Sequence, residues 1–340
     1  MAKKVLKAAL VGVGVAGQVS HIPAWKKLEG VELVALCDRD QEKALRVAQR
    51  FGVPVATSNF EDILADPEID VVDVCTPNYL HAPLAIAALQ SGKHVLVERP
   101  IARTAAETEK MVKAADKADR LLVCALAHRF REDTKILKKF VDRGELGDVF
   151  YTKAGWLRQR TDWRTEEWRQ QKQVSGGGVL MDLGVQMLDL ALHILGAPAV
   201  ESVTASAHRA GKAEVEDSCV ALIRLEGGGV LNLEVTWGLL MERDFAYVNL
   251  FGQTGAALWN PLRIHKGMHG SLVNVTPAVD SPRNVYKQAI EAQIAHFADC
   301  VRKGTAPGAT GAEMLEVMRL VDAIYRSAEQ GREVRLAQSS

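Results

Sequence analysis

Short apolar runs alternate with amphipathic helical patterns along the first part of the chain, and this alternation limits the fold more than any other feature. The strand-like runs are Ala8–Val13, Val31–Cys37, Val71–Cys75, His94–Val97 and Leu121–Ala125, and the helix-like runs between them are Ala16–Leu28, Asp40–Phe51, Tyr79–Gln90 and Thr104–Ala118. Nearly continuous apolar strands are typical of parallel sheets, because helices cover both faces of such a sheet. The pattern predicts a doubly wound α/β domain over residues 1–125.

A glycine-rich turn joins the first predicted strand to the first predicted helix. Its sequence, Gly12-Val13-Gly14-Val15-Ala16-Gly17, fits the pattern G-x-G-x-x-G. Glycines at these positions allow a tight turn, a close approach of the backbone to a pyrophosphate, and close packing of the helix on the strand. The helix N-terminus then offers free N–H groups to the anion. A glycine turn also occurs without a ligand, but the strand before it and the helix after it favour dinucleotide binding.

An acid and a base follow the second predicted strand, where they bear on the choice of dinucleotide. Asp38 comes about 20 residues after the last glycine, where a carboxylate accepts hydrogen bonds from a ribose diol and repels a 2′-phosphate. NAD is therefore favoured over NADP. Arg39 is the next residue, and an adjacent arginine can hold such a phosphate, so NADP remains possible.

The pattern changes beyond residue 125. The segments Val200–Ala207, Val215–Leu225, Val230–Leu239 and Ala246–Phe251 alternate apolar and polar residues, and helical patterns cover Glu132–Arg143, Tyr286–Arg302 and Ala312–Glu329. Such alternation predicts an antiparallel sheet with two unlike faces. We therefore expect a second domain over residues 126–340. Its open sheet face needs a cover, and a second subunit in a homodimer or homotetramer would supply one.

Composition excludes several classes of protein. The 340 residues exceed what a single core usually holds, and the equal numbers of Lys+Arg and Asp+Glu, 42 each, give no basic excess for binding nucleic acid. Five widely spaced cysteines, without a Cys-x-x-Cys pair, indicate reduced and buried thiols. The apolar N-terminus is interrupted by Lys7, so it is interpreted as a strand and not a signal peptide. The sequence shows no membrane span, and we expect a cytoplasmic protein.

Several ordered motifs resemble one known family. They are the stretch Cys75-Thr76-Pro77-Asn78 with His81 after it, Gly92-Lys93-His94, Glu98-Arg99-Pro100, "AHRF" (127–130), "SGGGVLMDLGVQMLDL" (175–190) and "DAIYRSAEQGREVRL" (322–336). Together they resemble the Gfo/Idh/MocA oxidoreductases, which include inositol dehydrogenase and glucose–fructose oxidoreductase. The resemblance implies a Rossmann domain followed by an α/β domain with a large, mostly antiparallel sheet, an NAD(P) cofactor and a sugar-like substrate.

The resemblance also implies roles for individual residues. Thr76, Pro77, Asn78 and His81 would line the nicotinamide side, with Glu98 near the nicotinamide ribose. Cys75 would also belong to the cofactor-binding residues. His81 could instead only cap its helix.

The catalytic positions depart from the family pattern. Members usually carry Glu-Lys-Pro, with the lysine at the substrate hydroxyl, but here the middle residue is Arg99. The pattern Asp-x-x-x-His of inositol-type members becomes Asp182-x-x-x-Gln186. Arginine titrates at or above about 12, so at neutral pH at most about one part in 10⁵ is free base. Arg99 and Gln186 would therefore position the substrate, and Asp182 is the one residue of the three that can exchange a proton.

Two further features leave alternatives open. Asp182, Gln186, Asp189 and His193 form a polar stripe on a helix opened by Gly176-Gly177-Gly178, which is also typical of a solvated face. The resemblance makes the last two structural. Between Trp156 and Trp168, tryptophans and arginines interleave, as in a substrate-gating loop, an oligomer contact or an ordinary surface loop.

Three functions fit these residues. The favoured hypothesis is an NAD(P)-dependent oxidoreductase acting on a sugar, polyol or related hydroxy compound. The alternatives are an NAD(P)-binding regulatory or scaffold protein without turnover, and an enzyme that uses bound NAD transiently in hydrolysis or epimerisation.

Overall fold

The computed structural model describes residues 5–160, 167–210, 213–278 and 284–336. The chain forms two compact units. The first unit comprises Met1–Ala127 with Asn284–Leu315, and the second comprises His128–Arg283 with Glu316–Ser340. Each unit is thus built from two stretches of chain. The expected division into residues 1–125 and 126–340 stays a prediction.

A six-stranded parallel sheet with the order β3-β2-β1-β4-β5-β6 forms the centre of the first unit. Its strands are β1 Leu6–Val11, β2 Val31–Cys37, β3 Val55–Thr57, β4 Val71–Val74, β5 His94–Val97 and β6 Leu122–Cys124. Every residue of β4 is buried, as expected for a strand with helices on both faces. The order reverses between β1 and β4, and in such sheets ligands bind at this point, outside the carboxyl ends of the strands.

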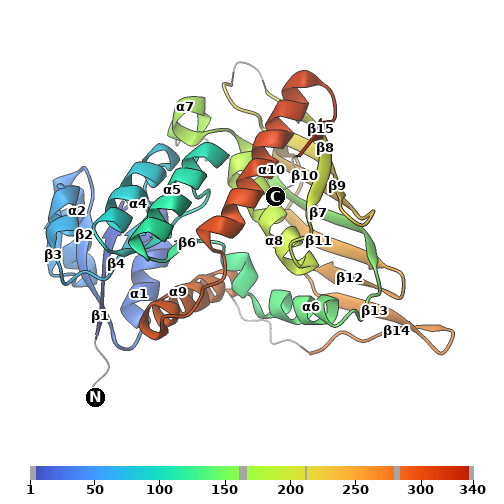
Figure 1. Cartoon of the computed structure of the whole chain (residues 1–340), viewed down its shortest axis with the longest axis horizontal. Helices are drawn as coiled ribbons and strands as arrows, with labels where there is room; N and C mark the ends of the chain where they lie inside the picture. The colour runs from blue at the N-terminus through green and yellow to red at the C-terminus, as the bar shows by residue number, and fades with distance from the viewer. Residues whose placement is uncertain (1–4, 161–166, 211–212, 279–283, 337–340) are drawn as a thin grey trace. The chain divides into compact units, whose positions relative to one another are not determined.

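Helices connect the strands of the first unit. They are α1 Ile22–Lys27, α2 Gln41–Phe51, α3 Phe60–Ala65, α4 His81–Gln90 and α5 Ala105–Ala118, with α9 Val285–Lys303 added from near the C-terminus. In Figure 1, α4 lies beside α5 and packs on β4 and β5, whereas α1 packs on β2 and against α9. The side chains of Asp40 and Thr104 accept hydrogen bonds from the first turns of α2 and α5, which explains why these helices begin there. The doubly wound domain is confirmed.

A nine-stranded sheet with the order β14-β13-β12-β11-β7-β10-β9-β8-β15 forms the second unit. Its strands are β7 Val149–Gln159, β8 Val200–His208, β9 Ser218–Leu225, β10 Val230–Leu239, β11 Phe245–Gly252, β12 Gly255–Trp259, β13 Arg263–Met268, β14 Ser271–Asn274 and β15 Val334–Arg335. Neighbouring strands are antiparallel except for β7 and β10, which pair in parallel. The predicted large, mostly antiparallel sheet is confirmed.

Helices cover one face of the second sheet. The helices of this unit are α6 Glu132–Asp142, α7 Lys172–Ser175, α8 Val185–Leu195 and α10 Gly311–Gln330, of which the part from Glu316 onward belongs to it. Figure 1 shows α6 and α8 on the same side of the sheet, where α8 packs on β7 and β11 and α6 packs on β12. Along β9, buried residues such as Ala221 and Ile223 alternate with the exposed Val220 and Leu222. The sheet therefore has two unlike faces, as predicted.

One helical stretch, Lys172–Leu195, is long and apolar enough to cross a membrane by length and composition alone. Its most apolar window has a mean hydropathy of 1.5, but 89% of that window is buried inside the protein. The stretch contains α8, the helix that packs on β7 and β11. A core helix of this kind passes the same test, so the stretch is weak evidence for a membrane span.

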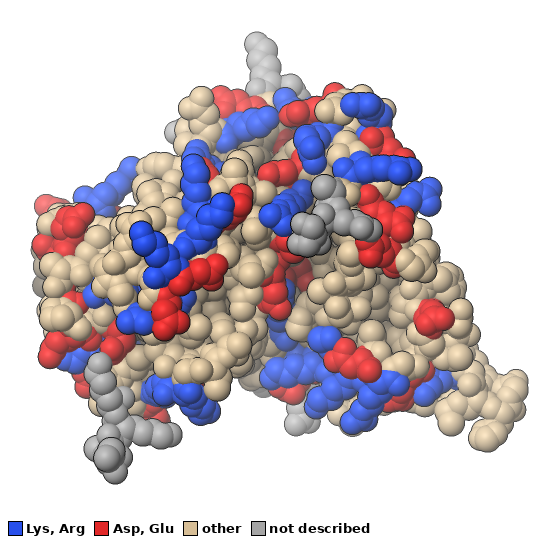
Figure 2. Space-filling model, in the orientation of Figure 1, with Lys and Arg blue, Asp and Glu red and all other residues tan. Residues whose placement is uncertain are grey.

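The surface and the cysteines fit the composition. Basic and acidic side chains are interspersed over the face shown in Figure 2. All five cysteines are buried free thiols, as predicted. Burial raises the pKa of Cys37 to about 11 and that of Cys219 to about 12, so neither is an activated nucleophile.

Candidate active site

The glycine turn after β1 is built by close backbone contacts in the first unit. Gly12 has a φ of +97°, and a Cβ on it would lie 2.6 Å from the main-chain oxygen of Cys75. A Cβ on Gly17 would lie 2.7 Å from the main-chain oxygen of Gly12. At Gly14 a Cβ would meet no described atom within 4 Å. Gly12 and Gly17 are thus required by the protein itself, whereas Gly14 borders open space.

Asp38 is anchored against this turn. Its Oδ2 accepts a hydrogen bond from the main-chain N–H of Val13 at 2.9 Å and one from Lys43 Nζ at 3.2 Å. Arg39 is exposed beside it. The structure therefore brings Asp38 to the glycine turn, as the sequence suggested, and adds Lys43, which sequence reasoning missed. Asp40 caps α2, and Lys43 lies on the first turn of this helix. The predicted helix over Asp40–Phe51 was therefore a signal that Lys43 lies near Asp38.

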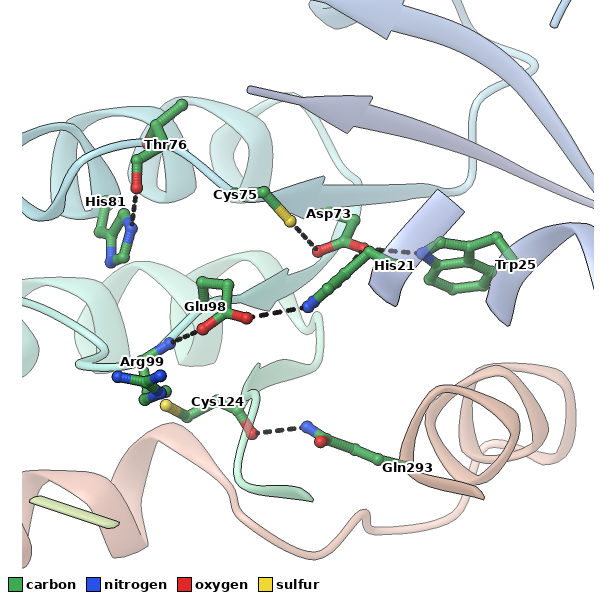
Figure 3. A network of polar contacts seen from close by, with 10 residues as sticks. All are labelled: His21, Trp25, Asp73, Cys75, Thr76, His81, Glu98, Arg99, Cys124 and Gln293. Atoms are coloured by element: carbon green, nitrogen blue, oxygen red, sulfur yellow. Dashed lines mark hydrogen bonds and ion pairs between the residues drawn. The ribbon is translucent and has the colours of Figure 1, made fainter. Parts of the chain in front are cut away.

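The loop after β4, the strand next to β1, supplies further residues at the same edge of the sheet as the glycine turn. Asn78 is buried, and Thr76 has a buried Oγ1 with no hydrogen-bond partner among the described residues. Figure 3 shows Thr76 and His81 close together at this edge. Because a buried hydroxyl rarely lacks a partner, Thr76 Oγ1 is suited to a ligand that completes the site.

His81 bridges two loops at this edge. Its Nδ1 lies 2.7 Å from the main-chain oxygen of Pro100, and its Nε2 lies 2.8 Å from that of Thr76. The ring is completely buried, and burial lowers the pKa of His81 more than the two carbonyls raise it. His81 therefore ties Thr76 to Pro100, which goes beyond capping its own helix. A direct contact with nicotinamide stays a prediction.

Glu98-Arg99-Pro100 follows β5 at the same edge of the sheet, and the Arg99–Pro100 peptide is cis. Glu98 Oε2 accepts a hydrogen bond from the main-chain N–H of Arg99 at 2.8 Å, and Oε1 lies 3.0 Å from His21 Nε2. Burial alone would raise the pKa of Glu98, but His21 and the charge of Arg99 lower it to about 2. Glu98 is therefore a carboxylate at neutral pH.

Sequence reasoning missed the buried partners of Glu98. His21 ends a π-helical turn, Gly17–His21, which precedes α1, and its Nδ1 lies 2.7 Å from Asp73 Oδ2 (Figure 3). Trp25 Nε1 donates to the same oxygen at 2.7 Å. The signal in the sequence was Asp73 itself, because an acid in the middle of an apolar strand needs buried partners.

In the second unit, Gly176-Gly177-Gly178 precedes a π-helical turn, Leu180–Gly184, that runs into α8. The buried carboxylate of Glu216 accepts hydrogen bonds at 3.0 Å from the main-chain N–H groups of Gly178 and Leu180, and one at 2.8 Å from Tyr325 Oη. A Cβ on Gly178 would lie 1.9 Å from the main-chain oxygen of Glu216. Glu216 thus fixes the start of the helix that carries Asp182.

Asp182 and Gln186 lie one helical turn apart on this helix, and both are buried. Asp182 Oδ2 accepts hydrogen bonds from Arg158 Nη1 and Trp237 Nε1, each at 3.1 Å, and Oδ1 lies 3.9 Å from Arg169 Nη1. Gln186 Nε2 donates to the main-chain oxygen of Asp182 at 2.8 Å. The two hydrogen bonds to Oδ2 and the charge of the Arg169 guanidinium near Oδ1 stabilise Asp182 as a carboxylate.

Asp189, a further member of the polar stripe, has a different partner from Asp182. Asp189 is buried in an ion pair with Arg129, whose Nε and Nη2 donate to it at 2.9 and 2.5 Å. Arg129 belongs to the "AHRF" stretch. This pair links two segments of the second unit, which fits the structural role that the resemblance implied for Asp189.

The Trp156–Trp168 segment is described only at its two ends. Trp156 lies on β7, donates from Nε1 to Asp244 at 3.2 Å and has the Arg158 guanidinium 4.9 Å from its ring. At the other end, the Arg169 guanidinium lies 4.7 Å from the Trp168 ring. Trp163 and Arg164 lie outside the described residues, so the gating loop stays a prediction.

Both domains of the chain match known proteins. Two sequence profiles match the chain: "Oxidoreductase family, NAD-binding Rossmann fold" over residues 6–126, and "Oxidoreductase family, C-terminal alpha/beta domain" over residues 138–336. D-glucoside 3-dehydrogenase of Escherichia coli (strain K12) is 31% identical over 99% of both chains. The NADP(+)-dependent scyllo-inositol 2-dehydrogenase of Bacillus subtilis (strain 168) is 25% identical over 97% of this chain and 96% of its own.

Solved structures share the fold. Levoglucosan dehydrogenase in complex with NADH superimposes with a TM-score of 0.91 at 24% identity, over 98% of this chain and 100% of that one. Both domains, in the same order, thus match one family, and the relatives align over nearly the whole chain. The chain belongs to the Gfo/Idh/MocA family of NAD(P)-dependent oxidoreductases.

Proposed function

We propose that this chain oxidises a ring hydroxyl of a neutral sugar, glycoside or polyol with NAD(P), or carries out the reverse reduction. The observation that carries the proposal is the likeness to D-glucoside 3-dehydrogenase over 99% of both chains. Turnover assays with methyl glucosides, inositols and hydroxy acids test it. We expect NAD(P) reduction by at least one of the first two groups. The proposal fails if hydroxy acids alone are oxidised.

The first unit fits the cofactor. Gly12 and Gly17 bring the backbone into close contact, Gly14 borders open space, and Thr76 has a buried hydroxyl to offer. The residues that would hold the dinucleotide are Gly12, Gly14, Val15, Ala16, Gly17, Asp38, Arg39, Cys75, Thr76, Pro77, Asn78, His81, Glu98 and Arg99. The chemistry that NAD(P) supplies when bound is acceptance of a hydride from carbon, or its return.

The proposed catalytic residues divide into one that exchanges a proton and two that position the substrate. Asp182 takes the hydroxyl proton as base or first relay, because it is held as a carboxylate by Arg158 and Trp237. Arg99 orients the hydroxyl with its fixed donors and does not titrate at neutral pH. Gln186 adds a hydrogen bond and holds the main-chain oxygen of Asp182.

The preference for NAD over NADP rests on Asp38, whose carboxylate is fixed at the glycine turn. We expect NADH to bind more tightly than NADPH in fluorescence titrations, because Asp38 repels a 2′-phosphate. Asp38→Ala should narrow the difference between the two dissociation constants. Lys43→Ala, which removes the cation 3.2 Å from Asp38, should widen it. A wild-type protein that prefers NADPH tenfold or more contradicts this assignment and makes Arg39 and Lys43 phosphate ligands.

A homo-oligomer is proposed from the exposed face of the second sheet. Leu222 and Leu258 are 42% and 38% exposed and lie in one cross-strand row with Asn232, Lys153 and Asn249. Leucines exposed on a sheet face are typical of a surface that a second copy covers.

Light scattering should therefore report a dimer or tetramer at micromolar concentration. Leu222→Glu should shift the protein toward the monomer, whereas Leu45→Glu, at an equally exposed leucine of α2, should not. A monomeric wild-type protein contradicts the proposal.

Two further assignments belong to this proposal. A cytoplasmic location is supported by the five free thiols, since thiols stay reduced in the cytosol. Residues 1–125 are proposed as the dinucleotide-binding domain and residues 126–340 as the domain for substrate binding and oligomerisation.

A further inference from the structure

Four charged side chains follow one another from the interior of the first unit to the carboxyl edge of its sheet (Figure 3). Asp73 lies within β4 and is completely buried. His21 comes next, with Nδ1 2.7 Å from Asp73 Oδ2 and Nε2 3.0 Å from Glu98 Oε1. Glu98 and Arg99 then follow β5. Neither His21 nor Asp73 is among the proposed catalytic or cofactor-binding residues.

The hydrogen bonds determine where the protons are. Two carboxylates only accept, so the imidazole between them donates from both nitrogens, and its positive charge is compensated by theirs. The neutral carbonyl partners of His81 offer no such compensation. Asp73 also accepts hydrogen bonds from Trp25 Nε1 at 2.7 Å and from the Cys75 thiol at 3.5 Å, which stabilises its anion. The charges therefore alternate from Asp73 to Arg99 and sum to zero.

Neighbouring groups from every packed element agree with this assignment. Asp73 and Cys75 face His21 from β4 and its end, Glu98 faces it after β5, and Tyr286 approaches from α9. Burial lowers the pKa of His21, but Asp73, and after it Cys75, raise it well above its usual range. Desolvation of its hydroxyl raises the pKa of Tyr286, so this hydroxyl stays neutral.

We propose that His21 is a positioning residue that stays protonated at neutral pH and, anchored by Asp73 and Trp25, holds Glu98 as a carboxylate at the cofactor edge of the sheet. The inference rests on the proposed function in placing NAD(P) at that edge. Glu98 in turn balances the charge of Arg99, so Arg99 offers donors without a net positive charge. That arrangement suits a neutral hydroxyl compound better than a carboxylate.

A metal site is the competing explanation. One ligand atom each of His21, Asp73 and Cys75 lie within 4.8 Å of one another. A cation there would need Nδ1 and the thiol deprotonated, yet Nδ1 lies at hydrogen-bond distance from Asp73 Oδ2, and that oxygen already accepts from Trp25. Zinc analysis of the purified protein should find far less than one zinc ion per chain. A stoichiometric ion overturns the proposal.

The protonation of His21 is measured on the full-length protein labelled with ¹⁵N-histidine. One imidazole should keep both ring nitrogens protonated from about pH 5 to above about pH 8, where a free histidine has lost its charge. This signal should be absent in His21→Gln. In Asp73→Asn the acid dissociation constant of this imidazole should rise at least tenfold. His208→Gln is the matched control, because His208 also contacts an aspartate, Asp217 at 3.1 Å, but its side chain is 73% exposed.

The consequence for the cofactor edge is measured as NADH affinity against pH. In Asp73→Asn the dissociation constant at about pH 8 should rise at least about fivefold and recover toward about pH 6, because His21 regains its proton there. A purely structural defect would weaken binding equally at both values. Trp25→Phe, which removes one N–H and keeps an aromatic ring, should show the same pH dependence to a smaller extent and serves if Asp73→Asn does not fold.

Failure of the proposed function and failure of the role proposed for His21 give different results. If the wild-type protein binds no dinucleotide, the proposed function fails, while the ¹⁵N signals still report on His21. If the wild-type protein binds NADH but His21 is neutral at pH 7, or if Asp73→Asn leaves both the signal and the pH dependence unchanged, the role of His21 is refuted.

Discussion

Asp182→Asn should lower the rate of hydride transfer by about 10²- to 10⁴-fold while NADH binding and thermal stability stay close to wild type. Asparagine keeps an oxygen that Arg158 and Trp237 can donate to, so the hydrogen-bonded frame around residue 182 is largely retained. It loses the ability to take a proton. Single-turnover kinetics and NADH fluorescence on the same preparation separate the two effects.

The pH profile provides a second observable for Asp182. With Asp182 as the one titrating group among the three catalytic positions, oxidation should rise through a single ionisation in the acid range, because Arg99 and Gln186 stay in one form. Asp244→Asn is a suitable control, since Asp244 lies 3.9 Å from the same arginine, Arg158. Full activity in Asp182→Asn contradicts the mechanism, and His81 or His128 would become the candidate base.

Gly14→Ala should raise the dissociation constant of NADH at least about tenfold without lowering the melting temperature. A Cβ at Gly14 meets no described atom within 4 Å, so the folded protein accommodates it. The methyl group would instead occupy the space into which the second glycine of the motif admits a pyrophosphate. Calorimetry measures the binding, and a thermal melt measures the stability.

Gly12→Ala is the matched contrast. Its Cβ would lie 2.6 Å from the main-chain oxygen of Cys75, and its φ of +97° is strained for any other residue. We expect the free energy of unfolding to fall by about 2–4 kcal/mol. Unchanged NADH affinity in Gly14→Ala would mean that the turn is not the pyrophosphate site.

The features that could be predicted from the sequence are those that depend on residues close together in the chain. The glycine turn and Asp38 are recognised by type and spacing, because the contacts that constrain Gly12 are made at a fixed place in every sheet of this kind. Continuous apolar runs likewise predicted the first sheet. The strand β3, Val55–Thr57, was not predicted, since three residues show no periodicity and it gains its order from pairing with β2.

The parts that the sequence could not predict depend on distant elements. His21 meets Asp73 only because a π-helical turn and β4 are placed side by side by the packed sheet. Arg158 and Trp237 reach Asp182 from β7 and β10, two strands far apart in the chain that pair in parallel. Strand order of this kind is a tertiary property, which neither periodicity nor motif spacing contains.

Direct transfer of a labelled hydride tests the central claim most closely. The sugar or polyol that gives the fastest turnover is prepared with deuterium on the carbon that is oxidised, and the reduced cofactor is examined by NMR. We predict that one deuterium appears at C4 of the nicotinamide, on a single face, in an amount equal to the product formed. Product formed without deuterium in the nicotinamide, or bound cofactor that no sugar or polyol reduces, would contradict the assignment of this chain as a sugar or polyol dehydrogenase.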